Sequence, residues 1–153
     1  MKGKIYVGYS GVGKTTYCSV DNSFIDLESS HFYKTDGWEQ NYISLALHLT
    51  YQGYNVFVSA HDVVRKFLRE LNYDYLIIAP SVELKDLWLD RLERRYKDTL
   101  SDKDYRAFDY TLKNFESSVL GLMEDARAII WLTPEIPYLN AHPDFKQSRK
   151  GVK

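Results

Sequence analysis

A short glycine-rich segment near the amino terminus constrains the fold of this chain more than any other feature. Residues 8–15 read Gly-Tyr-Ser-Gly-Val-Gly-Lys-Thr, a full match to the pattern G-x-x-x-x-G-K-[ST]. A short β-rich run at residues 4–7 precedes it, and a segment of helical character at 13–19 overlaps its end. Glycines let the main chain curl so that successive N–H groups point inward, and such a loop binds phosphate groups. The pattern therefore predicts a strand, a phosphate-binding loop (P-loop) and a helix.

The residue types in this loop suit a nucleoside triphosphate, which we expect to be ATP with Mg²⁺. Lys14 is expected to reach the β- and γ-phosphates, and Thr15 to place its hydroxyl on Mg²⁺. The residues expected to contact the nucleotide are Gly8, Ser10, Gly11, Val12, Gly13, Lys14, Thr15 and Thr16. The alternative is a glycine turn that binds no ligand, but the strand–loop–helix context favours nucleotide binding.

Short apolar runs alternate with helical periodicity along the rest of the chain. Strands are predicted at residues 4–7, 23–27, 55–59, 75–79 and 128–132. Helices are predicted at residues 13–19, 38–49, 64–71, 84–95 and 108–122. Because strands alternate with helices, we expect a parallel sheet with helices on both faces. The expected fold is α/β, the three-layer P-loop NTPase fold with five parallel strands in the order 2-3-1-4-5.

One domain is expected over residues 1–153, with a small lid around residues 94–105. The lid is expected because residues 97–104 are polar and short, as in a mobile segment that closes over phosphates. The polar tail from His142 is expected to fray.

Composition argues against several classes of protein. A formal net charge of -1 makes nucleic acid an improbable partner, since nucleic-acid-binding domains are usually strongly basic. The single cysteine, Cys18, excludes an internal disulfide and a multi-cysteine zinc site, and we expect it to be a plain buried thiol. We recognise no signal peptide and no stretch of membrane-spanning length, so we expect a cytoplasmic protein with no membrane partner. Either a monomer or a homodimer fits the sequence.

Two carboxylates follow the second predicted strand. Ligands of such folds bind beyond the carboxyl ends of the strands. Asp26 and Glu28 are two residues apart on an extended segment, so their side chains point to the same side, facing the loop. We expect Asp26 to bind Mg²⁺ with Thr15 or to accept the proton of the attacking oxygen, and Glu28 to hold the acceptor. The two roles can be exchanged, and a strand end or a helix cap at Ser29 or Ser30 is the alternative.

Three arginines share one face of the fourth predicted helix. Arg91, Arg94 and Arg95 stand at i, i+3 and i+4, and Arg91 continues the buried stripe of that helix. A cation at the edge of a core is costly unless an anion neutralises it, and the planar fork of arginine suits phosphate. We expect Arg91 and Arg95 to be catalytic and Arg94 to bind substrate. The alternative is a surface helix with Asp90 and Glu93 as ion-pair partners.

A third group of candidates follows the third predicted strand. Ser59 ends that strand, and His61 and Arg65 share one face at the start of the next helix. We expect all three to bind the acceptor, with Arg65 holding its phosphate, and a hydrogen bond near the helix cap is the alternative for His61. Trp38 and Tyr42 suit either the wall of an acceptor site or the core, and the core is favoured.

The remaining motifs decide between classes of P-loop protein. The Asp-x-x-Gly and Asn-Lys-x-Asp motifs of small GTPases do not occur, and the third strand does not end in the aspartate usual for P-loop ATPases. The sequence resembles small P-loop nucleotide kinases of the nucleoside monophosphate kinase type, especially short versions encoded by bacterial viruses. The segments that carry the resemblance are residues 8–16, 26–30, 58–61 with Arg65, and 88–95.

This resemblance implies transfer of the γ-phosphate of ATP to a (deoxy)nucleoside monophosphate. It also implies that Arg65 grips the acceptor phosphate and that Arg91 and Arg95 close over the transferring group. The segment Asp26-Leu27-Glu28 resembles the Asp-x-Asp of shikimate-type kinases as well, so the acceptor class stays open. The alternatives are a kinase acting on a polynucleotide 5′ end or another small hydroxyl acceptor, and a non-catalytic ATP-binding regulatory module.

Overall fold

A five-stranded parallel sheet forms the centre of the molecule. The computed structural model describes all residues except 1, 30–31, 33, 126, 144 and 146–153. The strands are β1 (Ile5–Gly8), β2 (Phe24–Asp26), β3 (Asn55–Ser59), β4 (Tyr75–Pro80) and β5 (Ile129–Leu132). Their order is β2-β3-β1-β4-β5, and each neighbouring pair is parallel. The predicted order is confirmed.

The central strands are apolar because both of their faces are covered. Val56, Phe57 and Val58 of β3 are fully buried, as expected of a parallel sheet between layers of helices. Gly8 pairs with Ser59 on one side and with Ile78 on the other. The phosphate loop therefore begins where the two neighbouring strands come to their carboxyl ends.

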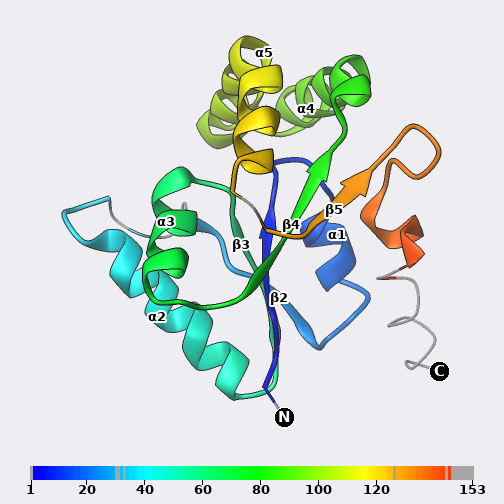
Figure 1. Cartoon of the computed structure of the whole chain (residues 1–153). Helices are drawn as coiled ribbons and strands as arrows, with labels where there is room; N and C mark the ends of the chain where they lie inside the picture. Colours follow the sequence, from blue (N-terminus) through cyan, green and yellow to red (C-terminus); the bar gives the residue numbers. More distant parts are fainter. Residues whose placement is uncertain (1, 30–31, 33, 126, 144, 146–153) are drawn as a thin grey trace.

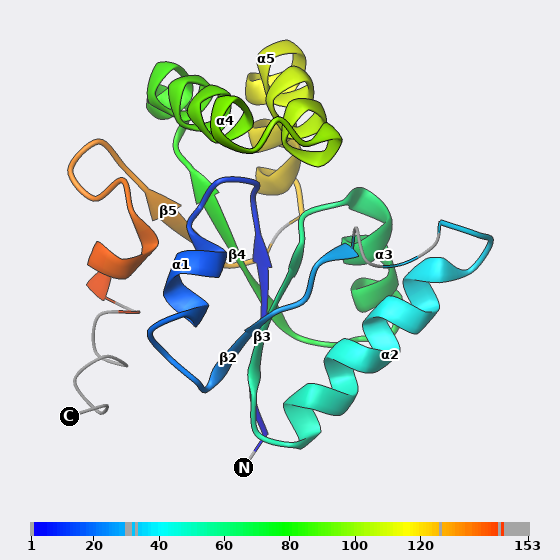
Figure 2. The same cartoon turned by 180° about the vertical axis from the view of Figure 1, so that it is seen from behind.

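The α-helices whose bounds lie within the described residues surround the sheet. They are α1 (Lys14–Cys18), α2 (Trp38–Tyr51), α3 (Asp62–Glu70), α4 (Lys85–Thr99) and α5 (Asp102–Met123), with short 3₁₀ turns at η2 (Val82–Leu84) and η3 (Leu139–Ala141). Figures 1 and 2 show α2 and α3 on one side of the sheet, and α1 with the segment after β5 on the other. The α4–α5 hairpin lies across the edge at which the strands end. Within the described residues, no helix is long and apolar enough to cross a membrane.

The segment predicted to form a lid is the tip of the α4–α5 hairpin. Most of residues 97–104 is helical. Leu100 adopts the left-handed conformation (φ 53°) that ends α4, and Ser101 caps α5 by accepting a hydrogen bond from the Asp104 N–H (3.1 Å). The sequence predicted no helix between residues 96 and 107, but the cap at Ser101 marks the start of α5 at Asp102. Movement of residues 94–105 as a lid stays a prediction.

Helical spacing in the sequence predicts that Leu112 shares the buried stripe of α5 with Phe115, Val119 and Leu122. This prediction is wrong for Leu112, which is 50% exposed, while Thr111 is buried. Asn114 has non-helical dihedral angles (φ -133°, ψ 15°) within the helix. A break of this kind shifts the helical phase, so residues before and after it do not share one continuous face.

Near the end of the described chain, Phe145 corrects the expectation of a frayed tail. Its side chain is 1% exposed, and the Tyr17 hydroxyl donates a hydrogen bond to its carbonyl oxygen (2.7 Å). Its ring packs against the rings of Tyr6, Tyr17, Phe24 and Phe57. A single aromatic residue among polar ones gives no periodic signal, so the pattern did not reveal this contact. Residues 146–153 of the expected tail lie outside the described residues.

Replacing Phe145 tests whether this contact stabilises the fold. We expect Phe145→Ala to lower the free energy of unfolding by about 3–5 kcal/mol, because it leaves a cavity among the aromatic rings. Urea denaturation followed by circular dichroism measures the loss. Met123→Ala, at a side chain that is 52% exposed, is the control and should cost no more than about 0.5 kcal/mol. Equal effects of the two substitutions would contradict a structural role for Phe145.

Candidate active site

The phosphate loop has the backbone that its sequence predicts. Gly11 (φ 89°) and Gly13 (φ 99°) adopt the left-handed conformation, which side chains disfavour, and Gly13 is the N-cap of α1. The Tyr9 N–H donates a hydrogen bond to the Ile78 carbonyl oxygen (2.9 Å), which ties the start of the loop to β4. The loop thus turns directly from the sheet into the helix that begins at Lys14.

Side chains of helix α4 support this loop by donating hydrogen bonds to the loop's carbonyl oxygens. The indole N–H of Trp88 donates to the Ser10 carbonyl oxygen (2.7 Å), and Arg91 Nη1 donates to the Gly11 carbonyl oxygen (2.9 Å). A Cβ built at Gly11 would lie 3.0 Å from Trp88 Nε1, so the indole closely approaches the main chain. The shape of the loop therefore depends on α4 as well as on its own glycines.

The other loop residues predicted to contact nucleotide differ in their exposure. Val12 is buried (1% exposed), whereas Thr15 and Thr16 are exposed in the first turn of α1. Gly8 leaves room for the Lys14 side chain, since a Cβ there would come within 2.8 Å of Lys14 Cδ. Their contacts with nucleotide stay predictions.

The structure brings together Thr15 and Asp26, the two residues predicted to hold Mg²⁺. Thr15 Oγ1 donates a hydrogen bond to Asp26 Oδ2 (2.8 Å), joining the loop to the end of β2. Asp26 Oδ1 is buried and has no hydrogen-bond partner among the residues that the structure describes. A hydroxyl beside a carboxylate with a free oxygen fits Mg²⁺, which binds to one or two carboxylates and completes its shell with phosphate and water. The described part of the chain contains no group of three or more His, Cys, Asp or Glu side chains able to hold a metal ion.

Lys14 lies among charges of both signs. Burial lowers the pKa of its ammonium group, the negative charges of Asp26 and Glu28 act to raise it, and the positive charges of Lys103 and Arg95 lower it further. Glu28 and Lys103 form an ion pair with each other. The loop lysine, the end of β2 and the hairpin tip therefore share one electrostatic environment. The sequence pattern does not single out Lys103; only its place within the predicted lid hints at it.

Arg95 and Arg94 have different surroundings despite being adjacent. Arg95 Nε lies 3.1 Å from Asp104 Oδ1, close enough for an ion pair, although the N–H is not aligned for a hydrogen bond. Burial disfavours the ionised form of Asp104, but the hydrogen bond from Thr99 and the charge of Arg95 outweigh it, so the pKa of this carboxyl is below its ordinary value. Arg94 is 77% exposed and pairs with Asp90 on the surface of α4 (3.1 Å). The structure does not bring Arg94 into the charged cluster.

Arg91 connects the loop to the segment after β5. Its second guanidinium nitrogen donates to the Pro137 carbonyl oxygen (3.0 Å), in addition to the bond with Gly11. The guanidinium stacks on Trp88 (4.2 Å to the ring centroid) and on Tyr138 (4.6 Å). Burial lowers its pKa, and Tyr138 acts in the opposite direction. A catalytic role for Arg91 stays a prediction, and it requires these contacts to be exchanged.

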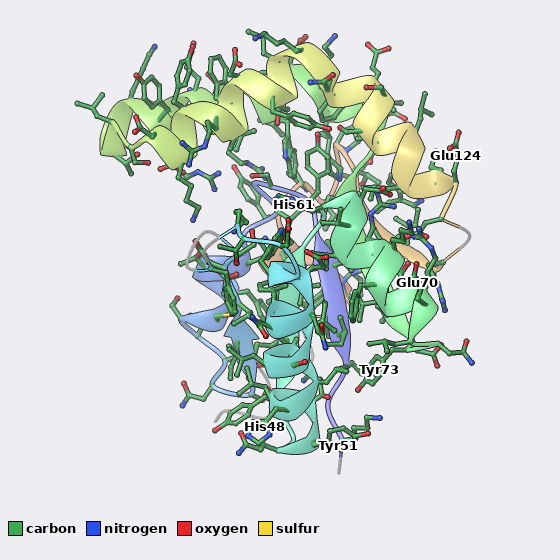
Figure 3. All side chains as sticks on the ribbon, turned by 90° about the vertical axis from the view of Figure 1, so that its left-hand side faces the viewer. His48, Tyr51, His61, Glu70, Tyr73 and Glu124 are labelled. Carbon is green, nitrogen blue, oxygen red and sulfur yellow. The ribbon has the colours of Figure 1, made fainter. Side chains whose placement is uncertain are left out.

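Ser59 and His61 lie beside the phosphate loop at the end of β3. The Ser59 N–H donates to the Tyr42 hydroxyl (3.0 Å), and Ser59 Oγ is buried without a hydrogen-bond partner among the described residues. His61 is the N-cap residue of α3, below the α4–α5 hairpin in Figure 3, and its ring lies 6.3 Å from that of Trp38. Tyr42 is fully buried and Trp38 is half-buried, so Tyr42 belongs to the core and Trp38 to its rim.

The electrostatic surroundings of His61 favour a neutral imidazole. His61 is exposed at the surface, but neighbouring groups partly desolvate its ring and lower its pKa, and the positive charges of Lys34 and Lys14 lower it further, below the ordinary value of 6.5. At pH 7 the side chain therefore offers one N–H donor and one acceptor to a neighbouring group.

Arg65, predicted to hold an acceptor phosphate, has an anionic partner within the protein. Its Nη1 lies 3.2 Å from Asp125 Oδ2, and its Nε donates to the Ala60 carbonyl oxygen (3.3 Å). The Asp125 side chain is 1% exposed and also contacts Arg69 and the Tyr75 hydroxyl. These contacts connect α3 and β4 to the segment after α5. Acceptor binding by Arg65 stays a prediction, but the structure gives this residue a structural role that its helical spacing did not suggest.

Comparison with known proteins gives a match of structure only. Neither family models nor curated proteins match the chain. The structure is similar to that of shikimate kinase from Bacteroides thetaiotaomicron, with a TM-score of 0.55 and 14% sequence identity over 99% of this chain and 97% of that chain. At this identity the likeness shows the fold alone. The chain has the fold of a P-loop kinase.

The P-loop kinase fold explains why the predicted residues come from distant parts of the sequence. The loop, Asp26 and Ser59 all follow strands whose carboxyl ends meet at one edge of the sheet. The α4–α5 hairpin lies over that edge (Figure 3). The site is therefore a property of the fold and the hairpin together.

Neutralising Asp125 tests the structural role of the Arg65 contact. Burial acts to raise the pKa of Asp125, but the Tyr75 hydrogen bond and the two arginines outweigh it and lower the pKa. The carboxylate therefore stabilises the fold above about pH 4, and this contribution is lost as the pH falls towards the folded-state pKa. We expect Asp125→Asn to lower the free energy of unfolding by about 3–5 kcal/mol at pH 7 and to weaken its acid dependence below pH 4.

Urea denaturation between pH 3 and pH 7 measures both effects of Asp125→Asn. The matched control is Asp74→Asn, because Asp74 is fully exposed and lies 3.5 Å from Arg127. Its cost should stay within about 1 kcal/mol at every pH. Similar losses for the two variants would show that the buried cluster contributes little.

Proposed function

We propose that this chain is an ATP-dependent phosphotransferase. The observation that carries the proposal is the contact between Thr15 and Asp26 beside Lys14, at the start of the helix that follows the phosphate loop. Phosphoryl transfer requires alignment of the triphosphate and neutralisation of its charge more than covalent chemistry. Lys14 supplies charge at the phosphates, with Arg95 and Arg91 as further cations that reach the transferring group if the hairpin rearranges.

Thr15 and Asp26 would hold Mg²⁺ in this proposal. The buried, unpartnered Oδ1 of Asp26 supports it, because a buried carboxylate oxygen is costly without a partner. Bound Mg²⁺ supplies positive charge to the phosphate oxygens. Asp26 holds the Thr15 hydroxyl in place, and Glu28 lies two residues further along the same side of the chain.

A (deoxy)nucleoside monophosphate is the acceptor that we propose. The resemblance to short phage-encoded nucleotide kinases supports this choice. The half-buried ring of Trp38, with Lys34 Nζ 4.3 Å from its centroid and His61 at its edge, supports binding of a flat base and an anionic group. Ser59 and Glu28 supply a hydroxyl and a carboxylate to orient the acceptor.

A small hydroxyl compound is a second candidate acceptor. The pairing of Arg65 with buried Asp125 favours it, because the arginine expected to grip an acceptor phosphate is already neutralised. The carboxylates of Asp26 and Glu28 suit an alcohol, since one of them can accept the proton of the attacking hydroxyl.

Incubation with a panel of acceptors tests the proposed function. The protein is mixed with Mg²⁺ and ATP and with each nucleoside and deoxynucleoside monophosphate, a set of small alcohols, and a 5′-hydroxyl oligonucleotide. We expect diphosphate formed from one or two monophosphates, and no product with Lys14→Met. Product only from an alcohol or the oligonucleotide would replace the proposed acceptor. ATP binding without any transfer would favour a regulatory module.

The proposed metal role of Asp26 predicts a change in Mg²⁺ dependence. We expect Asp26→Asn to raise the Mg²⁺ concentration for half-maximal activity about tenfold or more, because the amide carries no charge and the Thr15 contact is weakened. Activity measured against Mg²⁺ at saturating ATP gives this value. Asp98→Asn, on the exposed surface of α4, is the control and should leave it unchanged. An unaltered Mg²⁺ requirement in Asp26→Asn would remove Asp26 from the metal site.

A further inference from the structure

The tip of the α4–α5 hairpin contributes a cation to the edge of the sheet. Lys103, in the first turn of α5, forms an ion pair with Glu28, which lies 75 positions earlier in the chain. Its charge is close enough to influence Lys14. Lys103 therefore lies near the residue expected at the β- and γ-phosphates, although it comes from a different layer of the molecule.

A hydrogen-bond network fixes the backbone from which Lys103 extends. The next residue, Asp104, is 8% exposed and accepts a hydrogen bond from the Thr99 hydroxyl (2.6 Å). Its N–H donates to Ser101 Oγ (3.1 Å), and Arg95 lies 3.1 Å from its carboxylate. The tip is thus held by contacts within the hairpin, and they do not depend on the Lys103 side chain.

The pair between Lys103 and Glu28 is suited to exchange. The two side chains are 49% and 24% exposed, and a solvent-accessible ion pair contributes only about 0–1 kcal/mol. The ion pair of Arg95 exchanges less readily, because its partner Asp104 is buried. A phosphate group offers an ammonium more negative charge and more acceptor oxygens than one carboxylate does. Of Lys103 and Arg95, the two hairpin cations whose charges act on Lys14, Lys103 can therefore change partners at the lower cost.

We propose that Lys103 exchanges Glu28 for the γ-phosphate of ATP, which makes it a γ-phosphate-binding residue. This inference rests on the proposed function for the identity of the nucleotide. Its consequence is a difference between nucleotides. A triphosphate gains the Lys103 contact, whereas a diphosphate leaves Lys103 with Glu28.

Affinities for two nucleotides test this exchange without knowledge of the acceptor. Isothermal titration calorimetry gives Kd for ADP and for the non-hydrolysable ATP analogue AMP-PNP, both with Mg²⁺. We expect Lys103→Met to weaken AMP-PNP binding about tenfold or more, as for loss of a hydrogen bond to a charged group, and ADP binding by less than about twofold. Lys103→Arg should retain most of the preference for the triphosphate.

A second lysine on the hairpin provides a matched control. Lys97 pairs with Glu93 one turn away on α4 (3.5 Å) and is 69% exposed. Lys97→Met removes the same charge from the same hairpin, and it should leave both affinities unchanged. Thermal denaturation of each variant shows that it is folded.

Replacing Glu28 gives an independent measurement. We expect Glu28→Gln to strengthen AMP-PNP binding about two- to fivefold, because Lys103 no longer has to leave a carboxylate. When Lys103→Met is already present, adding Glu28→Gln should bring no gain in affinity for AMP-PNP, since the two side chains then no longer act on each other.

The outcomes separate this inference from the proposed function. Equal losses for ADP and AMP-PNP in Lys103→Met, or the same behaviour as Lys97→Met, would overturn the exchange. A lower melting temperature with an unchanged ratio of affinities would make the Glu28 pair a purely structural contact and also overturn it. Wild-type protein that binds neither nucleotide would overturn both proposals. The expected ratios in a protein that transfers no phosphate would support the exchange while the proposed function fails.

Discussion

The left-handed backbone at Gly11 and Gly13 is the constraint on which the candidate site depends. This conformation turns the chain from β1 into α1 and points the carbonyl oxygens of Ser10 and Gly11 towards α4, where Trp88 and Arg91 bind them. Because those oxygens have partners, α4 holds the loop in this shape from one side. Catalysis by electrostatic stabilisation requires such preorganisation, since groups that must reorient during the reaction lose much of their effect.

The charges around this loop form a mixed cluster rather than a purely positive site. Three cations, Lys14, Arg95 and Lys103, meet three carboxylates, Asp26, Glu28 and Asp104. Internal pairing limits the repulsion among the cations, so they can lie close together. The pairs differ in burial, however, so a polyanion that enters the cluster displaces the exposed partners before the buried ones.

The sequence predicted those parts of the fold and the site that depend on local residues or on the order of strands and helices. The glycine pattern predicted the loop, and the alternation of strands and helices predicted the sheet and placed Asp26 at the edge where Thr15 reaches it. The contacts that it did not predict join distant residues. Lys103 meets Glu28 across 75 positions, and Arg65 meets Asp125 across 60. Phe145 has no apolar neighbours in the sequence and therefore gives no periodic signal. The break at Asn114 occurs without a proline or glycine at that position, so the sequence gives no sign of it either.

Phe145 also bears on the order in which the chain can fold during synthesis. Its ring completes the aromatic group that covers one face of the sheet, and the other members, Tyr6, Tyr17, Phe24 and Phe57, all belong to the first half of the chain. These four rings leave the ribosome long before their last partner does. Until residue 145 has emerged, that face of the nascent sheet stays partly uncovered, in the state where chaperones bind and aggregation begins.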